Sequence, residues 1–386
     1  MISRAFSRRA CGRSAGLPGA LVVACLFLSC RPGFAGEPHA YRLSGDFWGT
    51  HDPSIVKHGK TWYVFATGKA PAGGQFAIRC SQDLKRWQFC GQVFDRIPEW
   101  IAKDSPGTKD LWAPDVSYYK GEYRLYYAYS LFGKNTSGIA LATNKTLDRS
   151  SPEYKWVDRG LVLRSTATDD FNAIDPNFVV DRKGRSWLAF GSFWTGIKLR
   201  RLDNQGKPSL QDTKLYSLAT RQRPDNAAPA KPGLPADWEA IEAPFIVPHG
   251  GYYYLFVSWD MCCRGSRSTY RTMVGRSTAI TGPYVDETGK PMMDGGGTEL
   301  LHGNSSWAGP GGESVFSQSG QDIMVFHAYD PKTGKPALQV STLDWWGGWP
   351  HAALGSEHEP APENVKHGPE AQHTTVSVLL SRPSLK

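Results

Sequence analysis

The chain has 386 residues, of which 40% are hydrophobic and 12% aromatic, so it can bury a large core within a single domain. Its formal net charge is +8, and the first 35 residues contain five Arg and no acidic residue. Without that segment the charge is +3, spread over a long remaining chain. A strongly basic surface for nucleic acid is therefore not indicated, and no nucleic-acid partner is expected.

Residues 1–35 are predicted to be a secretory signal peptide. An apolar stretch, Ala15–Ser29, lies between two arginines, and small residues up to Ala35 allow cleavage before Gly36. The stretch is too short for a comfortable membrane span, so no membrane span is expected. Cleavage ahead of Cys30, as in a lipoprotein, is a poorly matched alternative. We therefore expect a secreted protein, either periplasmic or extracellular.

From residue 36 onward, a short acidic cassette recurs, followed each time by a Gly turn between aromatic-rich strands. The steps between the acids are 63, 60, 67 and 71 residues, from Asp52 through Asp115, Asp175 and Glu242 to Glu313. Repeats at such spacing indicate a solenoid or a propeller, and four short strands per repeat without helical periodicity favour the propeller. The sequence predicts an all-β fold, a five-bladed β-propeller over residues 36–354.

Two stretches interrupt this pattern. Residues 355–386 are rich in Pro, Glu and His, and we expect a loosely ordered tail there. Residues 221–238 have the Pro and Ala content of an exposed loop.

Four cysteines follow the leader, an even number that suits an oxidising compartment. Cys80 and Cys90 flank a predicted hairpin turn, which fits a cross-strand disulfide or two free buried thiols equally well. Adjacent residues such as Cys262 and Cys263 lie closer together than disulfide-bonded residues usually do, so their state is left open. The lack of a second pair at zinc-finger spacing excludes a structural zinc site.

Three of the cassette acids suit the cleavage of a glycosidic bond. The innermost strands of a propeller line its axis, so acids distant in sequence can meet there. Glycoside hydrolysis needs one ionised and one protonated carboxyl. Asp52 suits the ionised base, Glu242 among apolar neighbours suits the protonated acid, and a nearby Asp175 would raise the proton affinity of Glu242. Asp and Pro also suit turns before strands on their own, but three cassettes in register favour chemistry.

Several motifs carry a resemblance to a known family. The segments HDPSIV, LWAPDV, AIDPNFVVD, GSFWTGIKL, IEAPF and GRSTAITGPY resemble those of glycoside hydrolase family 43, from about His51 to Pro350. GSFWTGIKL and CCRG resemble its arabinan endo-1,5-α-L-arabinosidases in particular. The resemblance implies hydrolysis of α-1,5-linked L-arabinofuranose chains, with Asp52 as base, Asp175 as pKa modulator and Glu242 as acid. It also implies inversion of configuration, and arabinan or an arabino-oligosaccharide as substrate, with no protein partner.

The same resemblance implies a set of substrate-binding residues. A sugar site combines aromatic platforms with a few hydrogen-bonding groups, and the alternative for each aromatic residue is packing within a blade. The predicted substrate-binding residues are Asp52, Gly133, Asn172, Asp175, Ser192, Phe193 and Trp194. Trp112, just before the second cassette, is added as a second aromatic platform because of its position.

The fifth repeat carries the predicted metal residue and a departure from the family pattern. His327 matches a family histidine that helps to hold calcium with waters, although an isolated His is more often a core residue. Where these arabinanases commonly have Gly-Pro-Gly-His-Asn-Ser, this chain has Gly312 and Glu313 in place of His and Asn. The change is expected to alter the cavity and could favour release of short oligosaccharides from a chain end.

Two alternatives to endo action remain. One is another activity on the same scaffold: an exo-acting arabinanase, an α-L-arabinofuranosidase or a β-xylosidase. The other is a glycan-binding propeller without catalysis. The sequence has no nucleophile elbow, zinc-protease helix or phosphate-binding loop that would point to different chemistry.

Overall fold

The computed structural model describes residues 37–227, 235–318, 320–356 and 359–360. The predicted signal peptide and most of the predicted tail lie outside these residues, as does part of the predicted 221–238 loop. Among the described helices, none is long and apolar enough to cross a membrane.

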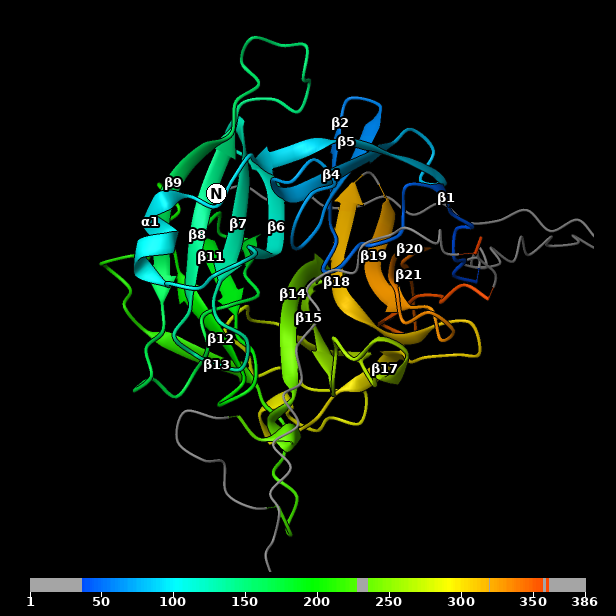
Figure 1. Cartoon of the computed structure of the whole chain (residues 1–386). Helices are drawn as coiled ribbons and strands as arrows, with labels where there is room; N and C mark the ends of the chain where they lie inside the picture. The colour runs from blue at the N-terminus through cyan, green and yellow to red at the C-terminus, as the bar shows by residue number, and fades with distance from the viewer. Residues whose placement is uncertain (1–36, 228–234, 319, 357–358, 361–386) are drawn as a thin grey trace, which may run out of the picture. The chain divides into compact units, whose positions relative to one another are not determined.

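Five β-sheets and one small hairpin make up the described chain (Figure 1). The first strands of the sheets contact one another in a closed ring, in the order β2, β6, β10, β14, β18 and back to β2. The predicted five-bladed β-propeller is therefore confirmed, with one cassette at the start of each innermost strand.

The blades follow one another in chain order. The first contains β2 (Ser54–His58), β3 (Thr61–Phe65), β4 (Gln75–Ser81) and β5 (Arg86–Phe94), with β1 (Ser44–Gly45) parallel to β5. The second contains β6 (Trp112–Tyr119), β7 (Glu122–Tyr129), β8 (Gly138–Asn144) and β9 (Val157–Arg164). The third contains β10 (Asn177–Val180), β11 (Ser186–Phe190), β12 (Ile197–Arg201) and β13 (Leu215–Ala219).

The fourth blade contains β14 (Ile241–His249), β15 (Tyr252–Trp259), β16 (Arg271–Ser277) and β17 (Thr298–Leu301). The fifth contains β18 (Ala308–Gln318), β19 (Gln321–Tyr329) and β20 (Pro336–Thr342). The remaining elements are the hairpin β21 (Asp344–Trp346) and β22 (Trp349–His351), helix α1 (Glu99–Asp104), and the 3-10 turns η1 (Asp237–Glu239), η2 (Gly265–Arg267) and η3 (Met292–Asp294).

The fifth blade has three strands of its own and is completed by the start of the described chain. Residues 39–49 run antiparallel to β20, with bridges from Ala40 to Ser341 and from Trp48 to Ala337. Backbone hydrogen bonds support both ends of this segment, including Tyr41 N to Val340 O at 2.8 Å. The prediction of four strands per repeat therefore holds for the last blade only because a distant segment supplies the outer strand.

Short polar side chains join the innermost strands of neighbouring blades. Four of them accept a hydrogen bond from a backbone N–H of the next blade: Ser54 from Val116 (2.9 Å), Asp115 from Phe178 (2.7 Å), Asn177 from Ile246 (2.9 Å), and Ser314 from Ile55 (3.0 Å). Burial raises the pKa of Asp115 to about 7, although Phe178 N–H and Asn177 oppose the shift. Asp115 thus links two blades, which separates it from the three acids predicted to be catalytic.

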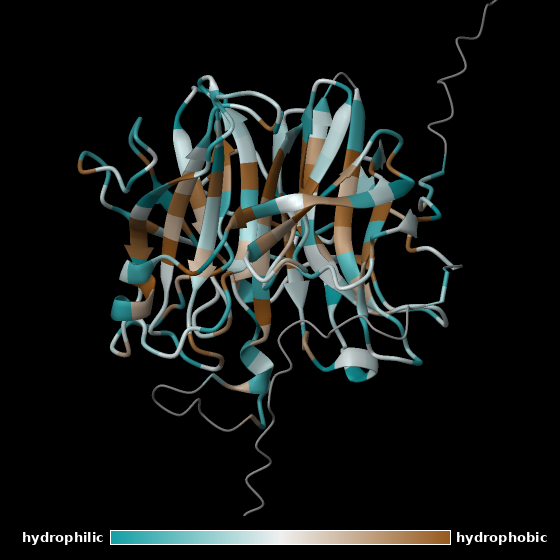
Figure 2. Cartoon of the chain, turned by 45° about the horizontal axis from the view of Figure 1, so that its top comes forward, coloured by the Kyte–Doolittle hydropathy of each residue, from teal (hydrophilic) through white to brown (hydrophobic). Residues whose placement is uncertain are grey.

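Each pair of neighbouring blades encloses its own apolar cluster. Among the described residues there are five such clusters, one between each pair of blades around the ring. Figure 2 shows the hydrophobic bands running across the strands. Burial of this apolar area is the main favourable term that holds blade against blade.

A disulfide joins β4 to β5 in the first blade. Cys80 and Cys90 are bonded with their Cα atoms 5.9 Å apart, a usual spacing for a disulfide. Of the two alternatives that the sequence left open, the structure has the cross-strand disulfide.

Candidate active site

The five cassettes share one backbone kink, placed directly before a proline. The residue before that proline has a positive φ in every blade: 44° at Asp52, 44° at Ala113, 55° at Asp175, 52° at Ala243 and 55° at Gly309. Positive φ is uncommon for residues other than glycine and costs on the order of 1–3 kcal/mol where the residue cannot relax. Because such strain gathers at functional sites, the kinks mark the axial end of the innermost strands as the candidate site.

Asp52 is held among donors. Oδ2 accepts hydrogen bonds from Thr67 Oγ1 at 2.7 Å and lies 2.9 Å from His51 Nδ1. Among the described residues, Oδ1 has only the 3.7 Å approach of His327 Nδ1. Burial alone would raise the pKa of Asp52, but the charge and hydrogen bond of His51, with His327 and Thr67, hold it well below its ordinary value. Asp52 is therefore ionised, with Oδ1 left to accept a proton.

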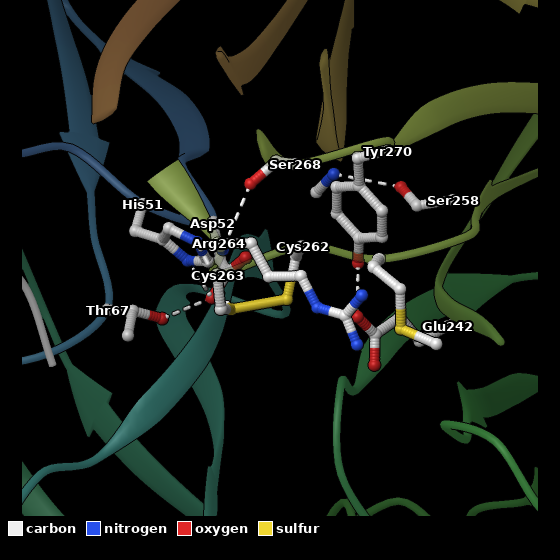
Figure 3. Close-up of a disulfide and its surroundings, with 12 residues drawn as sticks. His51, Asp52, Thr67, Glu242, Ser258, Cys262, Cys263, Arg264, Ser268 and Tyr270 are labelled. Atoms are coloured by element: carbon white, nitrogen blue, oxygen red, sulfur yellow. Dashed lines mark hydrogen bonds and ion pairs between the residues drawn. A yellow bond between two sulfur atoms is a disulfide. The ribbon is translucent and has the colours of Figure 1, made fainter. Parts of the chain in front are cut away.

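Glu242, the second residue of β14, meets hydroxyl groups instead. Oε2 accepts a hydrogen bond from Ser192 Oγ at 2.7 Å, and Oε1 accepts one from Tyr270 OH at 2.6 Å (Figure 3). Burial raises the pKa of Glu242, and the negative charge of Asp52 adds to the shift, while the two hydroxyls and His51 oppose it. The surroundings of Glu242 therefore favour the protonated form of its carboxyl group.

Asp175 completes the group of three acids. Its Oδ2 accepts a hydrogen bond from Ala243 N, one residue after Glu242, at 3.1 Å. Burial raises its pKa well above the ordinary value, and the charges of Glu242 and Asp52 raise it further. The structure thus brings Asp52, Asp175 and Glu242 together, with one carboxyl ionised and the others drawn toward the protonated form.

The segment after β11 supports Glu242. Ser192 is buried and donates to the acid, and Phe193 N donates to Ile241 O at 2.8 Å beside it. Phe193 and Trp194 are part-buried and have φ of 53° and 45°. Of these three predicted substrate-binding residues, Ser192 therefore positions the acid, and the two aromatics stand on strained backbone close to it.

The other predicted binding residues lie in the second and third blades. Trp112 is part-buried at the start of β6, next to Ala113, whose N–H donates to Thr67 at 2.7 Å. Gly133 lies in an exposed loop. Asn172 is buried and accepts a hydrogen bond from Ser137 at 2.7 Å. Asn172 thus ties the loop after β7 to the segment leading to Asp175, and no hydrogen bond joins its side chain to the three acids among the described residues.

His327 is fully buried beneath the base. Its Nδ1 accepts a hydrogen bond from Asp52 N at 3.2 Å, its ring stacks on His51, and burial lowers its pKa well below the ordinary value, with the His51 charge adding to the shift. With Nδ1 as acceptor, a neutral ring carries its proton on Nε2, which has no hydrogen-bond partner among the described residues. Calcium held by His327 together with waters remains a prediction.

The fifth-blade departure lies next to the base. A Cβ on Gly312 would stand 2.8 Å from Asp52 Oδ1 and 2.9 Å from the His327 ring, so this backbone has no room for a side chain. Glu313 is buried, and its Oε2 accepts a hydrogen bond from Ser258 Oγ at 2.9 Å. Burial raises the pKa of Glu313 to about 7. A pocket around the axis is lined by residues of all five cassettes, including Asp52, Asp175 and Glu313.

Four residues of the site escaped the sequence reasoning. His51, Thr67 and Tyr329 surround or support Asp52, and Tyr270 donates to Glu242. His51 stands directly before the base in the HDP cassette, which was a usable signal. The other three lie in different strands or loops from the acids they serve, and no local pattern distinguishes them from the many other hydroxyl residues.

The chain is similar to a known family and to known structures. Residues 48–350 match the family described as glycosyl hydrolases family 43. The extracellular endo-alpha-(1->5)-L-arabinanase 1 of Bacillus subtilis (strain 168) is 41% identical over 86% of this chain and 94% of its own length. The extracellular exo-alpha-(1->5)-L-arabinofuranosidase ArbA of Cellvibrio japonicus (strain Ueda107) is also 41% identical, over 78% of this chain and 85% of its own length. The solved GH43 endo-arabinanase from Bacillus licheniformis superposes with a TM-score of 0.71 and 46% identity, covering 81% of this chain and 99% of that one.

Proposed function

The chain belongs to glycosyl hydrolases family 43, and from this premise we propose that it is an arabinanase that cleaves α-1,5-linked L-arabinofuranosyl bonds within arabinan. One observation carries the proposal: Asp52 and Glu242 meet in one buried site, yet their pKa values are shifted in opposite directions. Two carboxyls whose environments separate their protonation states are the acid and base of a glycosidase.

In the proposed reaction each carboxyl carries out one step. Asp52 Oδ1 takes a proton from a water molecule while the water oxygen forms a bond to the anomeric carbon. Glu242 gives its proton to the oxygen of the departing sugar as the glycosidic bond breaks, and exchange with solvent restores both carboxyls. Attack by water opposite to the leaving group inverts the anomeric centre, a mechanism that requires carboxyls roughly 6.5 to 9.5 Å apart.

Asp175 and Ser192 prepare these groups. The Asp175 carboxyl receives the backbone N–H of Ala243, which holds the strand beside Glu242 in its kinked form. When Glu242 is protonated, its O–H needs an acceptor, and the Ser192 hydroxyl can reverse its role because it both donates and accepts. Trp112, Phe193 and Trp194 are the aromatic surfaces proposed to pack against the apolar faces of arabinose.

Endo action is proposed over exo action, although the chain has the same sequence identity, 41%, to a relative named as endo-acting and to one named as exo-acting. The endo relative matches a larger share of this chain, and the structural relative at 46% identity is also named an endo-arabinanase. Both curated relatives are named extracellular, which agrees with the predicted leader and supports secretion. The substitution of Gly312 and Glu313 keeps the exo alternative open to measurement.

The test is to incubate the mature protein with linear debranched arabinan and to separate the products by size over time, with Glu242→Gln as control. A falling ladder of mixed oligosaccharides supports endo action, whereas one short product from the outset supports the exo alternative. Binding without cleavage by the wild type would favour a glycan-binding propeller instead.

Calcium is tested in the same assay. If a hydrated ion beside His327 supports the base, chelation should lower the rate and added calcium should restore it. An unchanged rate after exhaustive chelation would remove an exchangeable ion from the proposal.

A further inference from the structure

A disulfide between adjacent residues stands beside His51, the neighbour of the base. Cys262 and Cys263 are bonded to each other, with Cα atoms 3.8 Å apart, in the loop between β15 and β16. Both residues are part-buried, and both sulfur atoms lie within 4.8 Å of a ring nitrogen of His51. In Figure 3 the bonded sulfurs are drawn between the side chains of Asp52 and Glu242. Nothing in the hydrolysis described above uses this disulfide.

A chain of hydrogen bonds leads from this loop to the base. Cys263 N donates to Tyr329 OH at 2.9 Å, and Tyr329 OH lies 2.6 Å from His51 Nε2. His51 Nδ1 lies 2.9 Å from Asp52 Oδ2. Cys263 N–H donates to Tyr329 OH, and His51 Nδ1 must carry the proton that faces Asp52, because a carboxylate can only accept.

The disulfide helps to orient the first of these hydrogen bonds, from Cys263 N–H to Tyr329 OH. Cys263 has a φ of 62°, a left-handed conformation that a residue with a Cβ adopts only at a cost. A bond between neighbouring side chains closes a small ring that includes their shared peptide, so few backbone conformations remain open to the pair. The ring thereby keeps Cys263 in the conformation that aims its N–H at Tyr329.

The same loop also reaches the acid. Its closing end leads into Tyr270, which donates to Glu242 at 2.6 Å. Between the two ends, Met261 N donates to Thr269 Oγ1 at 3.2 Å and Arg264 N donates to Ser268 Oγ at 3.0 Å. These bonds fold the loop on itself, so the disulfide is one fixed point of a segment that touches both halves of the site.

We propose that the Cys262–Cys263 disulfide is a positioning element for the catalytic base, acting through Tyr329 and His51 on the Oδ2 atom of Asp52. Fixing Oδ2 leaves Oδ1 turned toward the reacting water. The proposal rests on the proposed hydrolytic function for its kinetic effect, but the hydrogen-bonded chain itself can be observed without any substrate.

The kinetic experiment compares three variants with the wild type on a linear arabino-oligosaccharide: C262A/C263A, Y329F, and the two combined. Each of the first two should lower kcat by about tenfold with KM within about twofold, because a base slightly out of place reacts poorly with a substrate that still binds. The combined variant should lose no more activity than the more impaired of the two single variants, since both changes break the same chain of hydrogen bonds. The matched control is C80A/C90A, which removes the disulfide remote from the acids and should leave kcat unchanged.

A second measurement covers the case in which C262A/C263A does not fold. In the C80A/C90A background, a small dithiol reduces only Cys262–Cys263: it becomes a cyclic disulfide, and each cysteine gains one electron and one proton. The rate should fall to the C262A/C263A level and recover on reoxidation. An unchanged rate with both thiols free by titration would overturn the proposal, as would a rise in KM at constant kcat, which would make the disulfide a substrate contact.

A third readout separates failure of this proposal from failure of the proposed function. The hydrogen-bonded Nδ1 proton of His51 should give a downfield proton resonance that H51N removes. Y329F and C262A/C263A should broaden or shift that resonance, while C80A/C90A should not. A resonance unaffected by both changes would refute the chain, even if the wild type proved inactive on arabinan.

Discussion

The base half and the acid half of the site surround their carboxyls with different partners, although protein encloses both Asp52, which is part-buried, and Glu242, which is buried. Asp52 faces two imidazole rings and a threonine hydroxyl, and its pKa falls. Glu242 faces the hydroxyls of Ser192 and Tyr270, and its pKa rises. Burial pushes both pKa values upward, so the difference comes from the partners.

The comparison shows what kind of partner overcomes burial. A hydroxyl donates a hydrogen bond to a carboxylate but carries no charge, whereas an imidazolium does both. The propeller places the histidines in the first and fifth blades and the hydroxyls in the third and fourth, so each half of the site takes its electrostatics from two blades. Acid and base are therefore distinguished by which blades meet them, although their cassettes share one kinked backbone.

The largest effect should come from removing each carboxyl's function in turn. E242Q and D52N should each lower kcat on arabinan by about 10²- to 10⁴-fold, the usual contribution of a general acid or base. On an arabinofuranoside with a good aryl leaving group, E242Q should recover most of its rate because that leaving group needs no proton, whereas D52N should not recover. If the rates of both variants changed by the same factor with the better leaving group, Asp52 and Glu242 would not have the distinct roles of base and acid.

A second test crowds only the base half. G312A should lower kcat by about a hundredfold, because the new Cβ would stand 2.8 Å from Asp52 Oδ1 and force the carboxyl or the His327 ring to move. The control is G59A, where φ is similarly left-handed, 57° against 62°, but nothing lies within 4 Å. G59A places a side chain on left-handed backbone but creates no clash. An equal loss of kcat in both variants would therefore show that the crowding of Asp52 is not the cause.

A third test changes only the acid half. The Ser192 hydroxyl lowers the pKa of Glu242, so S192A should raise it further and move the alkaline limb of the kcat/KM profile to higher pH. A fall in kcat of about tenfold or less should accompany the shift, because the acid loses one of its supports. T195A is the control: it lies in the same segment but its hydroxyl donates to Asp170 O, away from Glu242. An alkaline limb that stayed fixed in S192A would assign that limb to another group.

Much of the fold could be predicted because its strand and turn signals are local in sequence and recur in each of the five repeats. The Gly turns between aromatic strands are short-range signals, and their repetition at similar spacing determines blade number. The outer strand of the fifth blade could not be predicted, since residues 39–49 pair with β20 some 300 residues away and carry no mark of that partner. The sequence also left the state of Cys262 and Cys263 open, because adjacent Cα atoms lie closer together than in most disulfides. In the structure the two residues do form a disulfide, which the loop between β15 and β16 accommodates.

The site divides in the same way. Asp52, Asp175 and Glu242 could be found because each stands at an equivalent point of a repeated cassette. Tyr270 and Tyr329 could not, because their roles depend on contacts made across blades, and a tyrosine in a strand more often packs in the core. The hydrogen bond from Ser192 to Glu242 could not be predicted for the same reason, since it joins the third blade to the fourth. The substrate contact of Ser192 stays a prediction.

The smallest test extends the comparison to a third buried acid. Glu313 receives hydrogen bonds from the hydroxyls of Ser258 and Thr272, as Glu242 does from its own pair, and has no histidine partner. If hydroxyls cannot overcome burial, Glu313 should hold its proton, in keeping with a pKa of about 7. A raised folded-state pKa stabilises the fold fully below about pH 4.5 and loses that contribution as the pH rises through about 7.

The expected measurement is a difference in pH dependence and not in activity. Between about pH 5 and pH 8, the wild type should lose on the order of 3 kcal/mol of unfolding free energy through Glu313, whereas E313Q stays neutral and should not. The control is E99Q at a position whose side chain is 75% exposed, where the wild-type slope should persist. If E313Q kept the slope, Glu313 would be ionised in the fold, and hydroxyl donors alone would suffice to stabilise a buried carboxylate here. The protonated state of Glu242 would then have to come from the neighbouring charge of Asp52, which D52N would reveal as a lower alkaline limb for the residual activity.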